Sequence, residues 1–134
     1  MMTLRDYFEN RTGISILSSA DRDGKVTAAV YSSPRVMDDG TVTFIMRERL
    51  TYHNIQKNPH AAFLFIENGP GYQGIRLFLT KVGENNDPEL ISKMTRRHLT
   101  PEEDHEKGPK HLVSFKVDKI LPLIGTGETG IMTR

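Results

Sequence analysis

Two arginines, Arg47 and Arg49, lie where a predicted strand meets a predicted helix, and no other residues of the sequence are as informative about chemistry. Residues 41–46 alternate as a strand does, and a helix is predicted to begin at Thr51 and to end before Pro59. The first turn of a helix presents unpaired N–H groups and partial positive charge, so it attracts anions. Guanidinium groups beside it can add charge-assisted hydrogen bonds. The pattern therefore indicates a phosphate site, and a solvated basic helix cap explains the same residues equally simply.

The other polar residues do not form a recognisable catalytic or metal-binding pattern. His98, His105 and His111 alternate with an acidic run, but their spacing matches no metal-ligand signature, so no metal site is predicted. The serines fall in predicted strands without a nucleophile elbow, so no Ser-His-Asp arrangement can be assigned.

The composition limits the class of protein. A chain of 134 residues suits one domain, predicted to span residues 1–134. The net charge of +1 gives no case for nucleic acid or an anionic membrane as a partner. Cysteine is absent, which excludes disulfides and thiolate chemistry and fits a cytoplasmic location. The sequence contains neither an apolar signal segment nor a window long enough to span a bilayer.

The elements that must position the two arginines are mostly strands. A short helix capped by Thr3 is predicted at the start, the helix after Arg49 is expected to turn Leu50 and Ile55 inward, and a further helix is predicted over residues 87–99. Residues 100–110 are expected to form a polar loop, and the glycine-rich tail is expected to be disordered or to pack on a partner. Strands are predicted over residues 14–20, 25–33, 41–46, 61–66, 72–82 and 111–120.

Hairpin turns at Asp21–Gly24 and Asp38–Gly40 join the first three strands, so the sheet is predicted to be mainly antiparallel. The apolar run AAFLFI, residues 61–66, indicates a strand buried on both faces. A closed or nearly closed β-barrel is therefore predicted rather than an open sheet.

This order of elements resembles the pyridoxamine 5′-phosphate oxidase-like, FMN-binding split-barrel family, and in length it is most similar to the small single-domain flavoproteins. The resemblance lies in three segments: ISILSSADRDGKVTAAVYSSP, DDGTVTFIMRERLTYHNIQKNPHAAFLF and, more loosely, NGPGYQGIRLFLTKV. It implies a mainly β fold with peripheral helices, a six-stranded antiparallel split barrel. It also implies a homodimer with FMN in clefts between the subunits.

The resemblance also implies where the cofactor would bind. The phosphate would lie against Arg47, Arg49 and Thr51. Many relatives have a lysine where Thr51 stands and a serine or histidine where Arg49 stands, so here an arginine would have to carry the charge. The second subunit would contribute residues from the loop before the last strand. The flavin ring and ribityl chain would pass Ala29, Val30, Tyr31, Phe44, Ile45 and Met46, and the second subunit's candidates are His105, Lys110 and His111.

The function implied is an FMN-dependent oxidoreductase or electron carrier acting with a small molecule or a redox protein. The tail GETGIMTR has no counterpart of the extension with which the true oxidase binds its substrate, so oxidation of pyridoxamine phosphate is not predicted. Two alternatives stay open: a split barrel that holds haem or a deazaflavin, with His105 or His111 as the haem ligand, and a non-redox interaction module.

Overall fold

The computed structural model describes residues 2–95 and 99–134, so the end of the predicted 87–99 helix and His98 lie outside the described residues. The elements follow in the order β1 (Met2–Thr3), α1 (Leu4–Glu9), β2 (Gly13–Ala20), β3 (Val26–Tyr31), β4 (Arg35–Val36), β5 (Val42–Arg47), α2 (Leu50–Lys57), β6 (His60–Glu67), β7 (Gly74–Asn85), α3 (Pro88–Met94), α4 (Pro101–Glu106), β8 (Lys110–Pro122) and β9 (Ile131–Met132).

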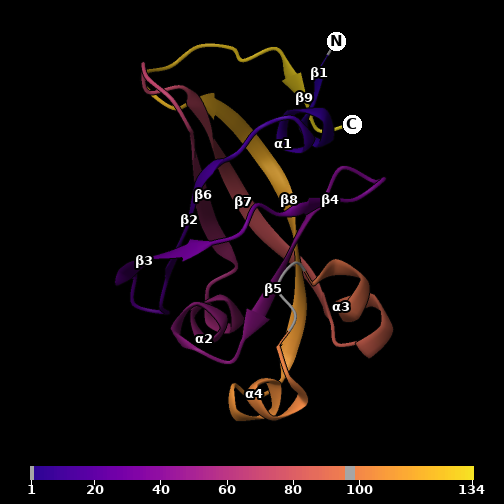
Figure 1. Ribbon diagram of the computed structural model, residues 1–134. Coiled ribbons are helices and arrows are strands. Elements are labelled where there is room, and N and C mark those ends of the chain that lie inside the picture. Colours follow the sequence, from indigo (N-terminus) through magenta and orange to yellow (C-terminus); the bar gives the residue numbers. More distant parts are fainter. Residues whose placement is uncertain (1, 96–98) are drawn as a thin grey trace.

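The main sheet is antiparallel and curled, with strand order β3-β2-β6-β7-β8-β5-β4 (Figure 1). The mainly β, split-barrel fold predicted from the sequence is confirmed. Its strand number is not, because the described part of this sheet has seven strands rather than six. The additional strand is β4, whose two residues pair with Val42 and Thr43 of β5. A two-residue strand is too short to show an alternating pattern in the sequence.

The core lies on the inner face of the curled sheet. Phe63 and Phe65 of β6 and Phe115 of β8 are fully buried there, and Phe44 of β5 packs against Phe63 with ring centroids 5.4 Å apart. Aromatic pairs of this kind add to the free energy gained by burying their surface. Alternate residues of each strand point to opposite faces of the sheet. The observed pairing register therefore places all of these aromatic residues on the inner face.

The outer face of strands β2, β3, β6 and β7 is apolar and is not covered by the described residues. The prediction that AAFLFI is buried on both faces is therefore wrong: its outward residues, such as Leu64, are only half-buried. The register places Ile16 of β2 opposite both Val30 of β3 and Leu64. We call this surface the outer face; its apolar members are Ile14, Ile16, Val26, Ala28, Val30, Ala62, Leu64, Ile66 and Phe78.

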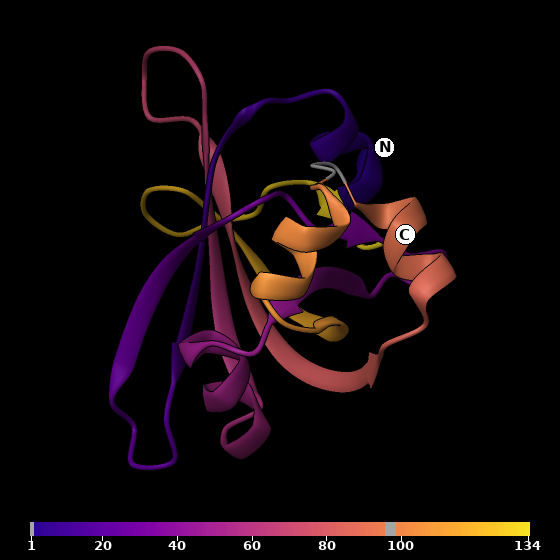
Figure 2. The same ribbon diagram turned by 60° about the horizontal axis from the view of Figure 1, so that its bottom comes forward.

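The helices do not all lie at one end of the sheet. α2 and α4 lie at the end opposite to α1 and the two termini (Figure 1), whereas α3 lies closer to α1 (Figure 2). Thr3 caps α1 through a capping box with Asp6, as predicted. In α2, Ile55 is buried as expected, whereas Leu50 is 60% exposed, contrary to expectation.

The segment predicted as a loop contains a helix. α4 begins with Pro101 in its first turn, and Thr100 forms a capping box with Glu103. A proline at this position and a capping box both favour a helix start, so the sequence carried a signal that its two prolines and high polarity obscured.

The C-terminal tail packs on the chain's own N-terminus. β9 pairs in parallel with β1, with Met2 opposite Ile131 and Thr3 opposite Met132. This pairing orders the end of the tail without a partner. No helix within residues 2–95 and 99–134 is long and apolar enough to cross a membrane.

Candidate functional site

The junction of β5 and α2 has the features of an anion site. Arg49 is the N-cap residue of α2, and no side chain caps the helix. The first turn contains no acidic residue that would neutralise its partial positive charge. The strand ends at Arg47, and Arg49 N–H donates to the Arg47 carbonyl at 2.8 Å, which makes the tight turn into the helix.

A cavity of about 320 Å³ opens beside this junction, and we call it the β5–α2 cavity. The volume falls near the lower end of the roughly 300–1,000 Å³ typical of small-molecule sites. It is lined by Val30, Tyr31, Ser32, Ser33, Arg35, Thr43, Phe44, Ile45, Arg47, Arg49, Met94, Thr95, Leu99, Lys107 and Lys110.

The charges of the β5–α2 cavity are all positive. Five of its lining residues are arginine or lysine, and none of the described lining residues is acidic. The remaining lining combines apolar and aromatic residues with four hydroxyl residues, Ser32, Ser33, Thr43 and Thr95. A ligand suited to it would have an anionic group, an apolar part and hydrogen-bonding groups.

The positive charge of the β5–α2 cavity is partly neutralised from outside it, by Asp104 of α4. Arg47 Nη2 donates to Asp104 Oδ1 at 2.7 Å, and Lys110 Nζ lies 3.2 Å from the same oxygen. Arg47 Nη1 also donates to the backbone carbonyls of Asp104 and Gly108. These contacts lower the pKa of the Asp104 carboxyl, chiefly through the hydrogen bond from Arg47. The carboxylate thus occupies a position where two cations converge on one anion.

Arg49 differs from Arg47 in having no hydrogen bond or ion pair from its side chain to any described residue. It is exposed at the helix start, and its charge acts on Tyr31 nearby. Burial raises the pKa of Tyr31, against the lowering effects of a hydrogen bond with Thr51 and the charge of Arg49. The Tyr31 hydroxyl therefore lies near Thr51 in the first turn of α2 and near the charge of Arg49.

The predicted site residues fall into two groups. Seven line the β5–α2 cavity: Val30, Tyr31, Phe44, Ile45, Arg47, Arg49 and Lys110. The other five do not: Ala29 is half-buried on β3, Met46 is fully buried in the core, Thr51 is buried in the first turn of α2, His105 is exposed on α4, and His111 lies outside the cavity.

His111 is held by two carboxylates and an aromatic ring. Its Nε2 lies 2.7 Å from Glu48 Oε2, and its Nδ1 lies 3.5 Å from Glu84 Oε2. The ring also stacks on Tyr52. Both ring nitrogens therefore have partners, which argues against His111 as an axial haem ligand.

Two cations of the cavity could not have been singled out from the sequence. Arg35 belongs to the two-residue strand β4, and Lys107 follows α4 in the segment expected to be a loop. Only the fold brings them to the β5–α2 junction. Within the described parts of the chain, no cluster of three or more His, Asp or Glu side chains could hold a metal ion.

The fold and this site agree with comparisons to known proteins. The sequence pattern of the family described as pyridoxamine 5′-phosphate oxidase matches residues 4–123. The chain therefore belongs to the pyridoxamine 5′-phosphate oxidase family. No curated protein matches the sequence.

Three solved structures illustrate the likeness of fold. An FMN-binding protein from Syntrophomonas wolfei has a TM-score of 0.70 and 23% identity, over 92% of this chain and 85% of that one. HupZ from Group A Streptococcus has a TM-score of 0.69 and 19% identity, over 97% of this chain and 100% of that one. An F420 reductase has a TM-score of 0.66 and 15% identity, over 90% of this chain and 98% of that one.

Proposed function

We propose that this protein is an FMN-binding flavoprotein of the cytoplasm that acts as an oxidoreductase or electron carrier. The observation that carries the proposal is the β5–α2 cavity, where five cations and an uncapped helix start adjoin aromatic and apolar walls. A phosphate suits the cations and the helix start, and a planar apolar ring suits Tyr31, Phe44 and Ile45. The FMN-binding protein from Syntrophomonas wolfei, which has the same fold, supports the choice of ligand.

The residues at the β5–α2 junction would divide the binding between them. Arg49 and the first turn of α2 would hold the phosphate, since Arg49 has no other partner within the described chain. Arg47 and Lys110 would contribute once the Asp104 carboxylate moves away from them. Tyr31 would donate a hydrogen bond from its phenol hydroxyl.

Bound FMN supplies hydride and electron transfer, which need no acid or base from a protein side chain. The chain's own contribution is to bind and orient the cofactor and to exclude water from it. This agrees with a cavity in which the described lining contains neither a carboxylate nor a histidine.

A homodimer would complete the cofactor site. The outer face carries apolar residues on four adjacent strands, interrupted by Ser18 and Arg76, and exposed apolar surfaces of this kind usually mark an interface. Val30, which is 78% exposed, belongs both to the outer face and to the wall of the β5–α2 cavity. A second copy packed on the outer face would therefore reach the β5–α2 cavity. It would enlarge the enclosed space, so that a cofactor larger than the cavity of one subunit would fit.

A deazaflavin is the second candidate ligand, because the F420 reductase has the same fold. It shares the ring shape and phosphate of FMN, so the same cations would bind it. The two ligands differ in their visible absorbance and mass, and the identity of the bound molecule distinguishes them.

The test is to purify the protein, record its visible spectrum and measure the mass of any ligand released on denaturation. Flavin absorbance bands and the mass of FMN are expected, as is saturable binding when FMN is added to stripped protein. A released deazaflavin would replace FMN in the proposal. A colourless protein that binds neither ligand would overturn it.

A further inference from the structure

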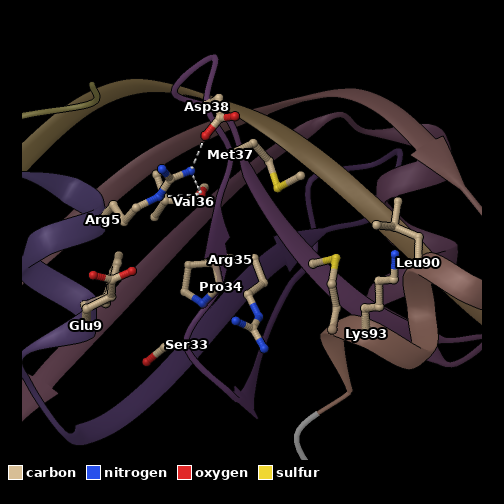
Figure 3. A pocket seen from close by; sticks show the side chains of 12 residues that line it. Arg5, Glu9, Ser33, Pro34, Arg35, Val36, Met37, Asp38, Leu90 and Lys93 are labelled. Carbon is tan, nitrogen blue, oxygen red and sulfur yellow. Dashed lines mark hydrogen bonds and ion pairs between the residues drawn. The ribbon is translucent and has the colours of Figure 1, made fainter.

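A second cavity, of about 410 Å³, lies between α1, β4 and α3 (Figure 3), and we call it the α1–α3 cavity. This volume is also in the range of roughly 300–1,000 Å³ that is usual for small-molecule sites. It shares Ser33, Arg35 and Met94 with the β5–α2 cavity, so the two adjoin. A molecule bound here would therefore lie next to the proposed cofactor.

Half of the residues that line the α1–α3 cavity are apolar. Two methionines are among them, and their flexible thioether side chains adapt to ligands of different shape. The apolar members are Phe8, Pro34, Val36, Met37, Leu90 and Met94.

The charged residues of the α1–α3 cavity differ between its α1 side and the part lined by β4 and α3. Arg5 is already neutralised, since its guanidinium donates to Asp38 Oδ1 at 2.9 Å and to the Val36 carbonyl. Arg35 and Lys93 have no hydrogen bond or ion pair to any described residue. Figure 3 shows Arg5 and Glu9 on one side and Lys93 on the other, with Arg35 between them.

Arg35 of β4 and Lys93 of α3 would attract an anionic group to the part of the cavity between these two elements. Glu9 on the opposite side would repel one, and the apolar residues between them would contact an uncharged body. A ligand that matches this arrangement carries one negative group at one end and an apolar body.

We propose that the α1–α3 cavity binds a small organic acid, with its carboxylate at Arg35 and Lys93 and its apolar body against Phe8, Met37 and Leu90. The role of this acid as the substrate of the flavoprotein rests on the proposed function, whereas its binding does not.

The experiment uses phenylacetate as the probe and phenethyl alcohol, which has nearly the same body without the charge, as its control. Each is titrated into the FMN-loaded protein by calorimetry and by amide chemical shifts. Phenylacetate is expected to bind about tenfold more tightly than the alcohol and to shift the amides of Met37 and Leu90.

Two lysine variants locate the binding. Lys93→Ala is expected to weaken phenylacetate binding roughly three- to fivefold, as for the loss of an exposed ion pair. Lys57→Ala removes an exposed lysine of α2 that lines neither cavity, and it should leave binding unchanged. The proposal would be overturned if the protein bound phenethyl alcohol as tightly as phenylacetate, or if Lys93→Ala and Lys57→Ala bound phenylacetate equally well. It would also be overturned if the amide shifts were confined to other regions, or if no binding were seen up to the solubility limit.

The same titrations, carried out on FMN-loaded protein and on protein without FMN, separate this proposal from the proposed function. Protein that binds FMN but not phenylacetate would overturn only the acid site. Protein that binds phenylacetate at Lys93 but never FMN would retain the acid site and overturn its role in flavin chemistry.

Discussion

The rings of Tyr52 and His111 stack face to face, with centroids 4.6 Å apart and planes inclined by 19°. Tyr52 belongs to α2 and His111 to β8, and the Tyr52 hydroxyl donates to the carboxylate of Glu84 on β7. Gln56 Nε2 and Lys81 Nζ bind the other oxygen of Glu84 at 3.0 and 2.9 Å. This cluster fastens α2, whose first turn borders the β5–α2 cavity, to the strands behind it.

His111→Phe should be tolerated better than His111→Ala. Phenylalanine can retain the stacking on Tyr52, whereas alanine loses both the stacking and the contacts with Glu48 and Glu84. We expect His111→Ala to lower the free energy of unfolding by about 1–2 kcal/mol and His111→Phe by about half as much. Urea denaturation measures both. Equal losses in the two variants would show that the ring contact contributes nothing.

Acid should weaken the fold through Glu84. Burial tends to raise the pKa of its carboxyl, but hydrogen bonds from Tyr52, Lys81 and Gln56 outweigh this and lower the pKa from 4.5 to about 2. Because the folded-state pKa is depressed, the stabilisation is complete above the unfolded value. It is lost as the pH falls from about 5 through 2.

Glu84→Gln is the variant that tests this. The carboxylate is partly exposed, so we expect its contribution at neutral pH to be about 1–2 kcal/mol after solvent screening. The variant should lose this at pH 7 and show a flatter decline in stability between pH 5 and 3, measured by urea denaturation. Glu128→Gln, at an exposed glutamate, is the control. A decline as steep as that of the wild type would contradict the assignment.

The sequence predicted those parts of the fold that depend on local pattern. Alternation and the apolar run of residues 61–66 identified every strand of the main sheet except β4. The turn at Asp38–Gly40 does form a hairpin, but it joins β4 to β5; the prediction that it pairs the second and third predicted strands, β3 and β5, is wrong. Two-sided burial of AAFLFI was inferred because each of its residues is apolar. Composition could not distinguish a face buried in the chain's own core from one left for a partner.

The candidate site could be predicted only where it is contiguous in sequence. Arg47 and Arg49 were found because a strand end and a helix start adjoin them, whereas Arg35 and Lys107 reach the cavity through the fold alone. Nothing in the sequence indicated that Asp104 would pair with Arg47, since the two are 57 residues apart.

The two arginines of the β5–α2 junction should respond differently to substitution. Arg49→Ala removes a cation without a partner in the described chain, so FMN affinity should fall by about 1–3 kcal/mol with stability unchanged. Arg47→Ala breaks the contacts with Asp104 and Gly108 and should also lower the melting temperature. FMN titration and thermal denaturation measure the two effects. Arg22→Ala, in the exposed β2–β3 turn, is the control. If Arg49→Ala and Arg22→Ala bind FMN with the same affinity, Arg49 does not belong to the site.

Asp104→Asn should strengthen FMN binding. The Asp104 carboxylate lies 2.7 Å from Arg47 Nη2 and 3.2 Å from Lys110 Nζ, so it competes with a phosphate for the same cations. Asparagine keeps the size of the side chain and removes the charge. We expect affinity to rise roughly fivefold, measured by FMN titration at low salt. Weaker binding by the variant would mean that Asp104 supports the site rather than competing with its ligand.

A charge on the outer face should separate the proposed dimer and weaken FMN binding together. Val30 is 78% exposed and lines the β5–α2 cavity, so Val30→Glu would place a carboxylate in the apolar interface and beside the cofactor. Ala28→Glu tests the interface without touching the cavity, because Ala28 lies two residues away on the same face of β3 and is not among the lining residues. Val82→Glu, at the irregular end of β7 and 56% exposed, is the matched control outside the outer face.

Sedimentation equilibrium should give dimers for the wild type and Val82→Glu and monomers for the other two. If Ala28→Glu is a monomer that binds FMN as tightly as the wild type, the second copy does not complete the cofactor site.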